Sequence, residues 1–357
     1  MPDYSFVDHP DNIQQNINGH AQLGVDTEFM REKTYFAQLC LVQISTRDAI
    51  YCVDPLVENG QGEFWEVLLA SSWVVHSARQ DIEVVYQTAD AMPHEIFDTQ
   101  IAAGLLGMSA QIGYAGLVKE LFDVEMAKSH TRADWTRRPL SEAVLDYAAE
   151  DVLYLLPAAD ILSEGLDKKD RLDWARQDSA LLLDPLLYDI SGSQAVDRLK
   201  GARNFRGARR AAAVRLATWR EEEAIRRNRP RQWIIRDNVL LDIAYRLPSS
   251  EKQLAEIEGI SPKLVSRAGK RLIESVGASK DDNNGYKPPL PPDEAQKTLL
   301  KELQALVAEC AKDLNLAAET VASKRELSSV IITGNRKTRV FTGWRRDLIG
   351  ERLLQLL

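Results

Sequence analysis

Four acidic residues that lie far apart in this sequence could form one metal site. Asp26 and Glu28 end an apolar run, and Asp81 and Asp151 follow much later in the chain. Mg²⁺ and Mn²⁺ take carboxylate and phosphate oxygens as ligands. Two such ions about 3.5–4 Å apart can activate a water molecule and stabilise the oxygen that leaves a phosphodiester. These residue types are therefore suited to phosphoryl chemistry on divalent metal ions.

The pattern around Asp26 and Glu28 predicts a β-strand. Residues two apart on a strand face the same side, so both carboxylates would point at a common ion. Residues 73–76 form a second apolar, strand-like run, and the helical pattern that follows it carries Asp81. We therefore expect strand and helix to present three of the four acids.

A longer helical pattern carries the fourth acid. Residues 143–156 have helical periodicity and contain neither Gly nor Pro. Tyr147 and Asp151 are four positions apart, so they would share one face of this helix. One strand and two helices could thus present four acids and a phenol to one cleft.

Three motifs in this chain resemble those of a known superfamily. DTE at 26–28, HSARQD ending at Asp81 and YAAED at 147–151 are similar to the exonuclease motifs of the DEDD superfamily, and Tyr147 marks its tyrosine subclass. The resemblance covers about the first 185 residues. Three further segments are similar to ribonuclease D: FAQLCLVQIS (36–45), FDTQIAAGLLG (97–107), and W..RPLSE with Trp135, Arg138, Pro139 and Leu140.

The resemblance implies an α/β ribonuclease H-like fold, a mixed sheet flanked by helices, with two divalent ions (Mg²⁺ or Mn²⁺) as cofactors. Asp26, Glu28 and Asp151 would hold the ion that activates water. Asp26 would also reach the second ion, which Asp81 would support. Tyr147 would orient the water, because a phenol with a pKa of about 10 is a poor base at neutral pH.

Four further side chains are candidates for contact with the substrate. Gln38, Trp135 and Arg138 lie in the segments that are similar to ribonuclease D. His76 could contact a phosphate, although a histidine at a strand end is more often hydrogen-bonded within the protein. The polar, basic loop at 126–140 is expected to face the substrate, or else it only connects two elements.

Each motif also has a structural explanation that involves no chemistry. A DxE pair on a strand is common, and Asp81 could be a first-turn acid favoured by the helix dipole. Tyr147 and Asp151 could lie on a half-exposed helix. The joint occurrence of all the motifs in family order favours the nuclease.

Length and composition limit the other possibilities. A chain of 357 residues allows two or three domains. No apolar stretch approaches about 18 residues and no signal peptide is evident at the N-terminus, so we expect neither a membrane span nor secretion. Cys40, Cys52 and Cys310 show no CxxC spacing. Cys40 and Cys52 lie in apolar runs, which indicates buried thiols in a reducing, cytoplasmic environment. We also expect a monomer.

The net charge of −8 at first argues against a nucleic-acid partner, but the charge is unevenly distributed. From Arg203 to Arg236 there are eleven Arg, no Lys and three acids, a local balance of +8. Such a segment beside an acidic domain suits a protein that follows phosphates, or it is a solvated helix face. Phe205, Trp219 and Trp233 could stack on bases, although the spacing of Trp219 favours a core position.

The breakers in the chain predict its domains. Residues 1–185 alternate strand-like and helix-like runs, as expected of the exonuclease domain with its mixed sheet. Residues 200–280 read as four or five helices and resemble the HRDC domain, generally an auxiliary nucleic-acid-binding module. The Pro-rich segment 281–295 predicts a linker. Residues 296–357 are helical and look like a second, degenerate HRDC domain.

These observations predict a metal-dependent 3′–5′ exoribonuclease of the ribonuclease D type, which releases nucleoside 5′-monophosphates one at a time. The resemblance, not the spacing, supplies the direction and the substrate, RNA with a single-stranded 3′ end such as a tRNA precursor. Two alternatives stay open. One is a DNA 3′–5′ exonuclease, because the metal chemistry is indifferent to the 2′-hydroxyl. The other is an inactive RNA-binding adaptor, which the four intact acids and Tyr147 argue against.

Overall fold

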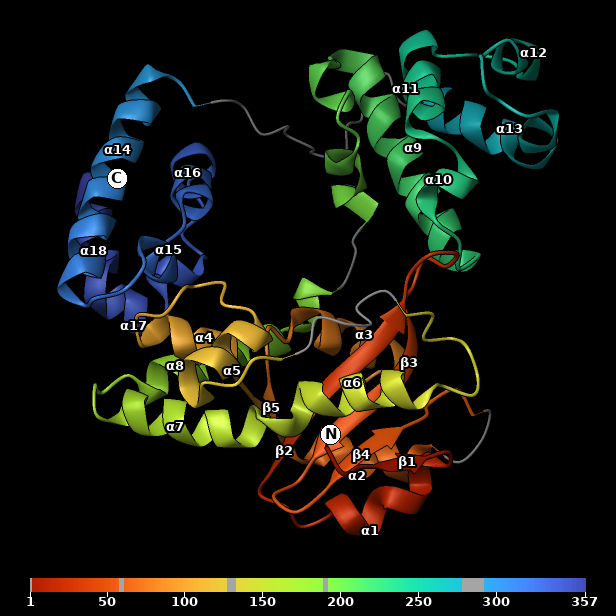
Figure 1. Cartoon of the computed structure of the whole chain (residues 1–357). Coiled ribbons are helices and arrows are strands. Elements are labelled where there is room, and N and C mark those ends of the chain that lie inside the picture. Colours follow the sequence, from red (N-terminus) through yellow and green to blue (C-terminus); the bar gives the residue numbers. More distant parts are fainter. Residues whose placement is uncertain (1, 58–60, 127–132, 189–191, 278–291) are drawn as a thin grey trace. The chain divides into compact units, whose positions relative to one another are not determined.

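The computed structural model (Figure 1) falls into two units by its internal contacts. We call them the sheet unit, with residues 1–30, 38–184 and 291–357, and the helical unit, with residues 31–37 and 185–290. The structure describes residues 2–57, 61–126, 133–188, 192–277 and 292–357, with the backbone alone for 192–194.

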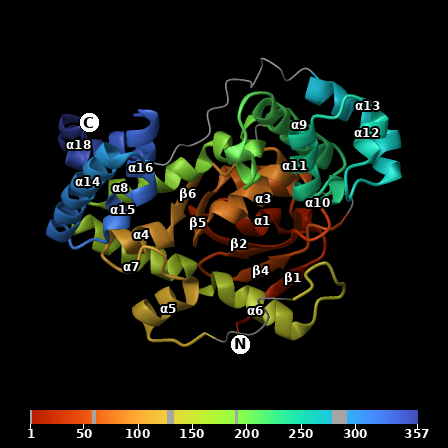
Figure 2. The ribbon, with the colours of Figure 1, turned by 90° about the horizontal axis from the view of Figure 1, so that it is seen from above.

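A mixed β-sheet forms the centre of the sheet unit, with six strands within the described residues in the order β1-β4-β3-β2-β5-β6 (Figure 2). Strand β2 lies antiparallel to β3 and parallel to β5. The predicted mixed sheet is confirmed, whereas β1 and β6 were not predicted, because runs of three and four residues carry little periodicity. The strands are β1 (Ser5–Val7), β2 (Gln22–Met30), β3 (Gln38–Ser45), β4 (Ile50–Val53), β5 (Ser72–Val75) and β6 (Glu95–Asp98).

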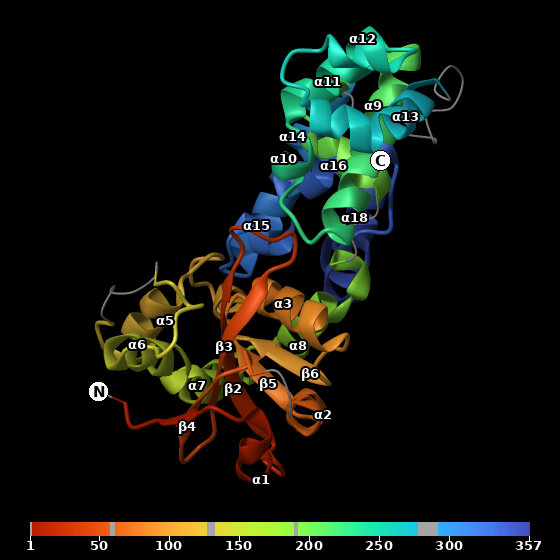
Figure 3. The same ribbon diagram turned by 90° about the vertical axis from the view of Figure 1, so that its right-hand side faces the viewer.

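Helices cover both faces of this sheet. Figure 3 shows α5, α6 and α7 on one side and α3 and α8 on the other, and both α6 and α7 contact β2. The helices are α1 (Gln14–Ile17), α2 (Gly62–Ala70), α3 (Arg79–Ala89), α4 (Thr99–Leu105), α5 (Tyr114–Phe122), α6 (Glu142–Leu153), α7 (Leu155–Asp167) and α8 (Leu172–Ala180).

The helical pattern expected over 143–156 spans two helices that meet at Tyr154. Pro157 explains the break, because its ring lacks an N–H and clashes with the carbonyl four residues earlier, at Leu153. The hydroxyl of Tyr114 accepts a hydrogen bond from the Tyr154 N–H at 2.9 Å and so satisfies a backbone donor at the junction. The break therefore follows directly after the turn that carries Asp151.

Gly24 lets this helix junction approach β2 closely. A Cβ atom at Gly24 would lie 2.2 Å from Oγ of Ser45 and 3.1 Å from Cβ of Leu155. Ser45 cannot easily move aside, because its hydroxyl donates to the carbonyl of Val152 at 2.9 Å. The missing side chain therefore sets the helix with Asp151 against the central strand.

The C-terminal helices pack onto the sheet unit and share its hydrophobic core. Asp178 of α8 accepts hydrogen bonds from Arg345 at 2.5 and 2.7 Å and from the Trp344 indole at 3.1 Å. The rings of Trp174 and Trp344 stack with centroids 4.3 Å apart. By these contacts the region from residue 296, expected to be a second HRDC-like domain, is part of the sheet unit, and its assignment as an HRDC domain stays a prediction. Its helices are α14 (Glu294–Asp313), α15 (Ala318–Val321), α16 (Lys324–Thr333), α17 (Gly343–Arg345) and α18 (Glu351–Leu356).

The helical unit contains five α-helices in the described residues, in agreement with the four or five expected. Ser250 caps α12 by accepting from the Gln253 N–H, Gly259 has a positive φ of 83°, and Pro262 is the first residue of α13. The helices are α9 (Gly207–Arg226), α10 (Arg231–Ile234), α11 (Asp237–Arg246), α12 (Glu251–Ala255) and α13 (Pro262–Gly277).

Of the linker predicted at 281–295, residues 281–291 lie outside the described residues. Asp293 forms a capping box with Gln296 at the start of α14. None of the helices in the described ranges has the length and apolar character that a membrane crossing requires. Cys40, Cys52 and Cys310 are free and buried, as expected for the first two.

Replacement of Gly24 by Ala should lower the free energy of unfolding by about 1–3 kcal/mol, because the added methyl group overlaps Ser45. Urea denaturation followed by circular dichroism measures the change. The double variant Gly24→Ala/Ser45→Gly should recover part of the loss. Gly62→Ala is the matched control, since no atom lies within 4 Å of its added Cβ. An equal loss in Gly62→Ala would show that the contact with Ser45 is not the cause.

Candidate active site

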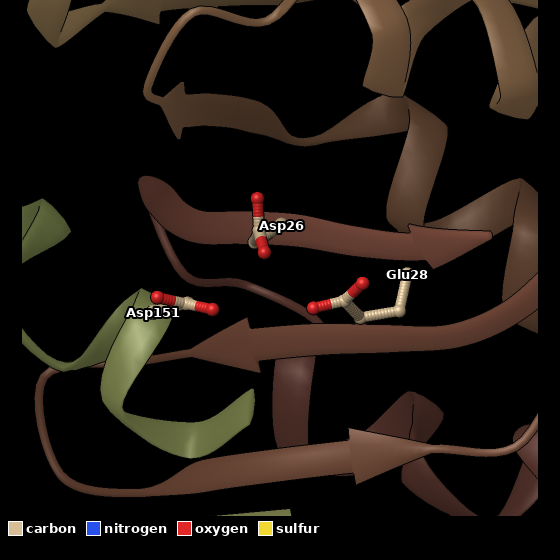
Figure 4. Close-up of side chains that lie close together, drawn as sticks. All are labelled: Asp26, Glu28 and Asp151. Carbon is tan, nitrogen blue, oxygen red and sulfur yellow. The ribbon is translucent and has the colours of Figure 1, made fainter. Parts of the chain in front are cut away.

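Three of the predicted acids meet between β2 and α6. One carboxylate oxygen from each of Asp26, Glu28 and Asp151 lies within 4.8 Å of the other two. Figure 4 shows the two acids of β2 and the acid of the helix around one shared space. All three side chains are half-buried. The strand and the helix thus bring together residues that are more than a hundred positions apart.

The local shape of β2 exposes these acids on one face. Thr27, between the two acids, and Val25, just before Asp26, are buried on the opposite face. The pairing of β2 with β3 shifts register between Glu28 and Phe29. Strand β5 pairs with β2 at Gln22–Gly24, before the first acid. At the acids, the edge of β2 on the β5 side is therefore not paired with β5.

Asp81, in the first turn of α3, interacts with this part of β2. Its Oδ1 accepts a hydrogen bond of 2.6 Å from the hydroxyl of Thr27. The negative charge of Asp81 raises the pKa of Asp26, although Asp81 stands outside the group of three. The structure therefore brings Asp81 to the site and restrains its carboxylate. Thr27 was not predicted to take part, although it lies inside the DTE motif.

Asp98, which the sequence analysis did not single out either, holds the turn before α3. Its carboxylate accepts from the N–H groups of Ser77 at 3.1 Å and Ala78 at 2.9 Å. The same carboxylate caps α4 by accepting from the Gln100 N–H at 2.8 Å. Asp98 thereby fixes the start of α3 and the position of Asp81. Its place in the FDTQ segment was the available signal.

Burial raises the pKa of all four acids, and the charges of neighbouring acids add to this effect. Burial is the largest cause, and it raises the pKa of Glu28 to about 8 and those of Asp81 and Asp151 to about 7. The pKa of Asp26 lies well above its usual value because of burial and of the charges of the other three acids. At neutral pH the cluster therefore holds protons or needs positive charge nearby.

Tyr147 lies one helical turn before Asp151 and hydrogen-bonds to it, which offsets part of the rise in pKa that burial causes at that carboxyl. Burial and the neighbouring acids raise the pKa of Tyr147 above its usual value. The phenol therefore stays protonated at neutral pH and acts as a hydrogen-bond donor. The ring of Trp135 lies 6.4 Å from that of Tyr147, centroid to centroid, and restricts its movement.

The donor set fits a divalent cation. Carboxylate oxygens are hard ligands of the kind that Mg²⁺ and Mn²⁺ prefer. A cation would also relieve the repulsion that raises the pKa values of Asp26, Glu28 and Asp151. These three residues are the ones that could hold it, with Asp81 beside them.

Comparison with known proteins agrees with this geometry. Residues 7–167 match the family model of a 3′–5′ exonuclease, and residues 209–276 match the HRDC domain. The chain is 35% identical to the ribonuclease D of Gluconacetobacter diazotrophicus over 96% of its own length and 89% of the relative. The chain belongs to the ribonuclease D family. The ribonuclease D of Xanthomonas oryzae is 32% identical over 99% of this chain and 98% of its own.

Solved structures extend the ribonuclease D match to three dimensions. The crystal structure of Escherichia coli RNase D, an exoribonuclease involved in structured RNA processing, has a TM-score of 0.90 at 25% identity and covers 99% of this chain and 98% of its own. The catalytic core of RRP6 from Trypanosoma brucei has a TM-score of 0.59 at 26% identity, over 78% and 80% of the chains. The predicted family, nuclease class and ribonuclease function are confirmed.

Two of the residues predicted to bind substrate lie on or near the sheet. Gln38 is exposed at the start of β3. His76 is half-buried, with Nδ1 2.9 Å from Oγ1 of Thr99 and Nε2 3.0 Å from the carbonyl oxygen of Ile112. Both ring nitrogens of His76 are thus hydrogen-bonded within the protein, which is the more common situation for a histidine at a strand end. A substrate contact stays a prediction for both residues.

The other two candidates, from the ribonuclease D-like loop, have internal contacts. Arg138 donates to Asp54 at 2.5 and 2.8 Å and to the carbonyl of Cys40 at 2.7 Å, so its guanidinium anchors the loop. Trp135 is 3% exposed and belongs to the core. The sequence could not show this, because the partners of both side chains are distant in the chain. Of the loop expected to face the substrate, residues 127–132 lie outside the described residues.

The metal-free protein should lose stability as the pH rises from about 4 to about 8. The site acids have a higher pKa when folded than the unfolded value of about 4, so the folded state binds more protons and its stability falls through this window. Asp26→Asn removes one charge and should therefore stabilise the protein at pH 8. Little or no gain is expected near pH 4, where the wild-type acids are protonated.

Urea denaturation with a chelator present, at both pH values, measures this difference. Glu302→Gln, at an exposed position of α14, is the control and should give no such pH-dependent gain. A gain from Asp26→Asn of equal size at both pH values would contradict the proposed repulsion.

Proposed function

We propose that this ribonuclease D family member trims RNA from the 3′ end by hydrolysis on two divalent metal ions and releases nucleoside 5′-monophosphates. The convergence of the carboxylates of Asp26, Glu28 and Asp151 carries this proposal. The match to the 3′–5′ exonuclease family supports the direction. The likeness to Escherichia coli RNase D over nearly the whole chain supports RNA as the substrate.

In this proposal each residue has a distinct task. Asp26, Glu28 and Asp151 hold the ions, and Asp81 supports the site from its fixed place beside Thr27. When bound, the ions would lower the pKa of the attacking water and stabilise charge on the leaving oxygen. Tyr147, which stays protonated, orients that water by a hydrogen bond. The contact between Tyr147 and Asp151 keeps the phenol directed at the site.

Some arginines of the helical unit form ion pairs within it and others do not, a difference that the sequence did not show. In the first group, each guanidinium forms an ion pair with a carboxylate of the same unit. These ion pairs stabilise the helices and reduce the charge that is left for a ligand. They join Arg220 to Asp237, Arg226 and Arg227 to Glu223, and Arg198 and Arg231 to Glu221.

In a second group, Arg209 lies over an exposed tyrosine, and the other members are neighbours in sequence of that tyrosine or of Phe205, whose ring is near it. Arg203, Arg206, Arg209 and Arg246 are exposed and have no carboxylate within ion-pair distance among the described residues. The guanidinium of Arg209 lies 3.9 Å from the ring centroid of Tyr245, which is 52% exposed. Free cations attract phosphates, and an exposed ring can stack on a base. We infer that this Tyr245 surface binds single-stranded RNA.

The aromatic residues first considered for stacking fall into different places. Trp219 is 4% exposed and part of the core, as its spacing suggested, whereas Trp233 is 58% exposed. The ring of Phe205 lies 6.4 Å from that of Tyr245, centroid to centroid, so Phe205 belongs to the Tyr245 surface. Tyr245 itself was not predicted.

The remaining parts of the proposal concern substrate, location and architecture. We infer that tRNA precursors with a single-stranded 3′ tail are substrates, and that the protein acts in the cytoplasm as a monomer. The three free, buried cysteines suit a reducing compartment. We also infer that residues 296–357 are a diverged second HRDC domain, since α14–α18 form a further small helical assembly.

The double variant Asp26→Asn/Glu28→Gln should lose hydrolysis by orders of magnitude while it retains RNA binding, because both substitutions keep side-chain size and remove metal-binding charge. Release of nucleotides from single-stranded RNA and fluorescence anisotropy measure the two properties. Asp160→Asn, at an exposed ion pair with Arg47, is the control and should hydrolyse RNA normally.

The same assay separates the alternative functions. Equal rates on single-stranded DNA and RNA would favour a general 3′–5′ exonuclease. Absence of turnover by the wild-type protein with both Mg²⁺ and Mn²⁺ would favour an RNA-binding adaptor.

Replacement of residues at the Tyr245 surface should weaken RNA binding in two distinguishable ways. Arg209→Ala should reduce the slope of log K against log salt by about 1, because one phosphate contact is lost. Tyr245→Ala should weaken binding by about 1–3 kcal/mol through lost stacking. Arg226→Ala changes the net charge equally but removes a cation that is already paired with Glu223, so it should weaken binding less. Equal losses in Arg209→Ala and Arg226→Ala would refute the assignment.

A further inference from the structure

The tip of the β2–β3 hairpin belongs to a different unit from its strands. Both strands lie in the sheet unit, whereas residues Arg31–Ala37 pack as part of the helical unit. Glu28 lies only three positions before this segment. The chain therefore passes from the sheet unit into the helical unit close to a site acid, and not only near residues 184 and 291.

Tyr35 is the centre of this packing. Its side chain is 7% exposed and belongs to the hydrophobic core of the helical unit. The Tyr35 hydroxyl donates to Oε1 of Glu221 and accepts from Nη2 of Arg231 at 3.1 Å. The guanidinium of Arg231 also lies over the ring, 4.7 Å from its centroid. The ring and the hydroxyl of Tyr35 are thus both held.

Glu221 makes this contact specific. The residue is 1% exposed and accepts from Arg231 at 2.6 Å and from Arg198 at 3.0 Å. Burial alone would raise the pKa of Glu221, but the hydrogen bonds from Arg231 and Tyr35 hold it below its usual value. A buried carboxylate of this kind needs its partners in place. Few side chains other than tyrosine could fill the space and supply the third donor.

The backbone of the tip is held as well. Oδ1 of Asn228 accepts from the N–H groups of Tyr35 at 3.0 Å and Phe36 at 3.1 Å. Asn228 has a positive φ of 45° in the turn that follows α9. One side chain thus satisfies two consecutive donors of the tip. Side-chain and backbone contacts together fix the segment within the helical unit.

We propose that the helical unit positions Glu28 through Tyr35, which makes Tyr35 a positioning residue for the metal site. The pairing of β2 with β3 shifts register directly after Glu28 and extends to Met30 and Gln38, so the tip beyond these residues depends on other contacts. Ordering of a free tip would cost about 1–2 kcal/mol per residue in backbone entropy, which the Tyr35 contacts offset. The proposal rests on the role of Glu28 as a metal ligand.

Titration calorimetry with Mn²⁺, without RNA, tests this proposal in the full-length protein. Tyr35→Ala should weaken Mn²⁺ binding by about tenfold, the effect of removing a residue that orients a ligand. Tyr35→Phe keeps the ring and should give a smaller loss. Asn228→Gly removes the acceptor without backbone strain and should also weaken binding. Circular dichroism shows whether each variant keeps its helices, and Tyr35→Phe and Asn228→Gly decide the outcome if Tyr35→Ala does not fold.

Two further variants separate the possible causes. Asp237→Asn breaks the ion pair with Arg220 in the same unit but leaves Tyr35 in place, so Mn²⁺ binding should be unchanged. An equal loss in Asp237→Asn, or wild-type binding by Tyr35→Ala, would overturn the positioning role. Glu28→Gln should weaken Mn²⁺ binding most. If it does not, the ligand role of Glu28 fails, and the inference about Tyr35 fails with it.

Discussion

Repulsion among half-buried carboxylates is the constraint that shapes the sheet unit. Burial, together with the charges of Asp81 and Asp151, raises the pKa of both Asp26 and Glu28, so the chain must hold these acids together against their charges. It does so through backbone anchors. The strand with the first two acids is central in the sheet, a carboxylate fixes the start of α3, and a serine hydroxyl bonds to the end of α6. This scaffold holds the acids together, and a bound cation would offset the repulsion between them.

Short-range periodicity predicted the site acids, whereas the contacts that hold them in place are between residues far apart in the sequence. The pairs Asp26 with Glu28 and Tyr147 with Asp151 follow from strand and helix geometry over two and four residues. By contrast, the bond from Thr27 to Asp81 joins residues 54 positions apart. The need for glycine at position 24 depends in the same way on distant neighbours. The internal roles of Arg138 and Trp135 were hidden for the same reason.

The count of charges along the sequence indicated a nucleic-acid partner, but the argument behind it was incomplete. The balance of +8 between residues 203 and 236 counts every arginine equally. In the folded unit, carboxylates from within and just beyond this segment pair with several of them, including Arg220 and Arg231. Others in the described part of the chain, such as Arg209 beside Tyr245 and Arg229 beside Trp233, have no such partner. Only the tertiary contacts distinguish cations that stabilise helices from cations that are free for phosphate.

The joint between α8 and the last helices also bears on how small a working enzyme can be made. A fragment that stops at the proline-rich segment would lack Trp344 and Arg345. The flat face of Trp174 would then meet solvent, and the carboxylate of Asp178 would lose its cation. The helices from Glu294 to Leu356 therefore complete the hydrophobic core of the sheet unit. In a shortened protein, Trp174 and Asp178 would first have to be replaced by residues suited to an exposed position.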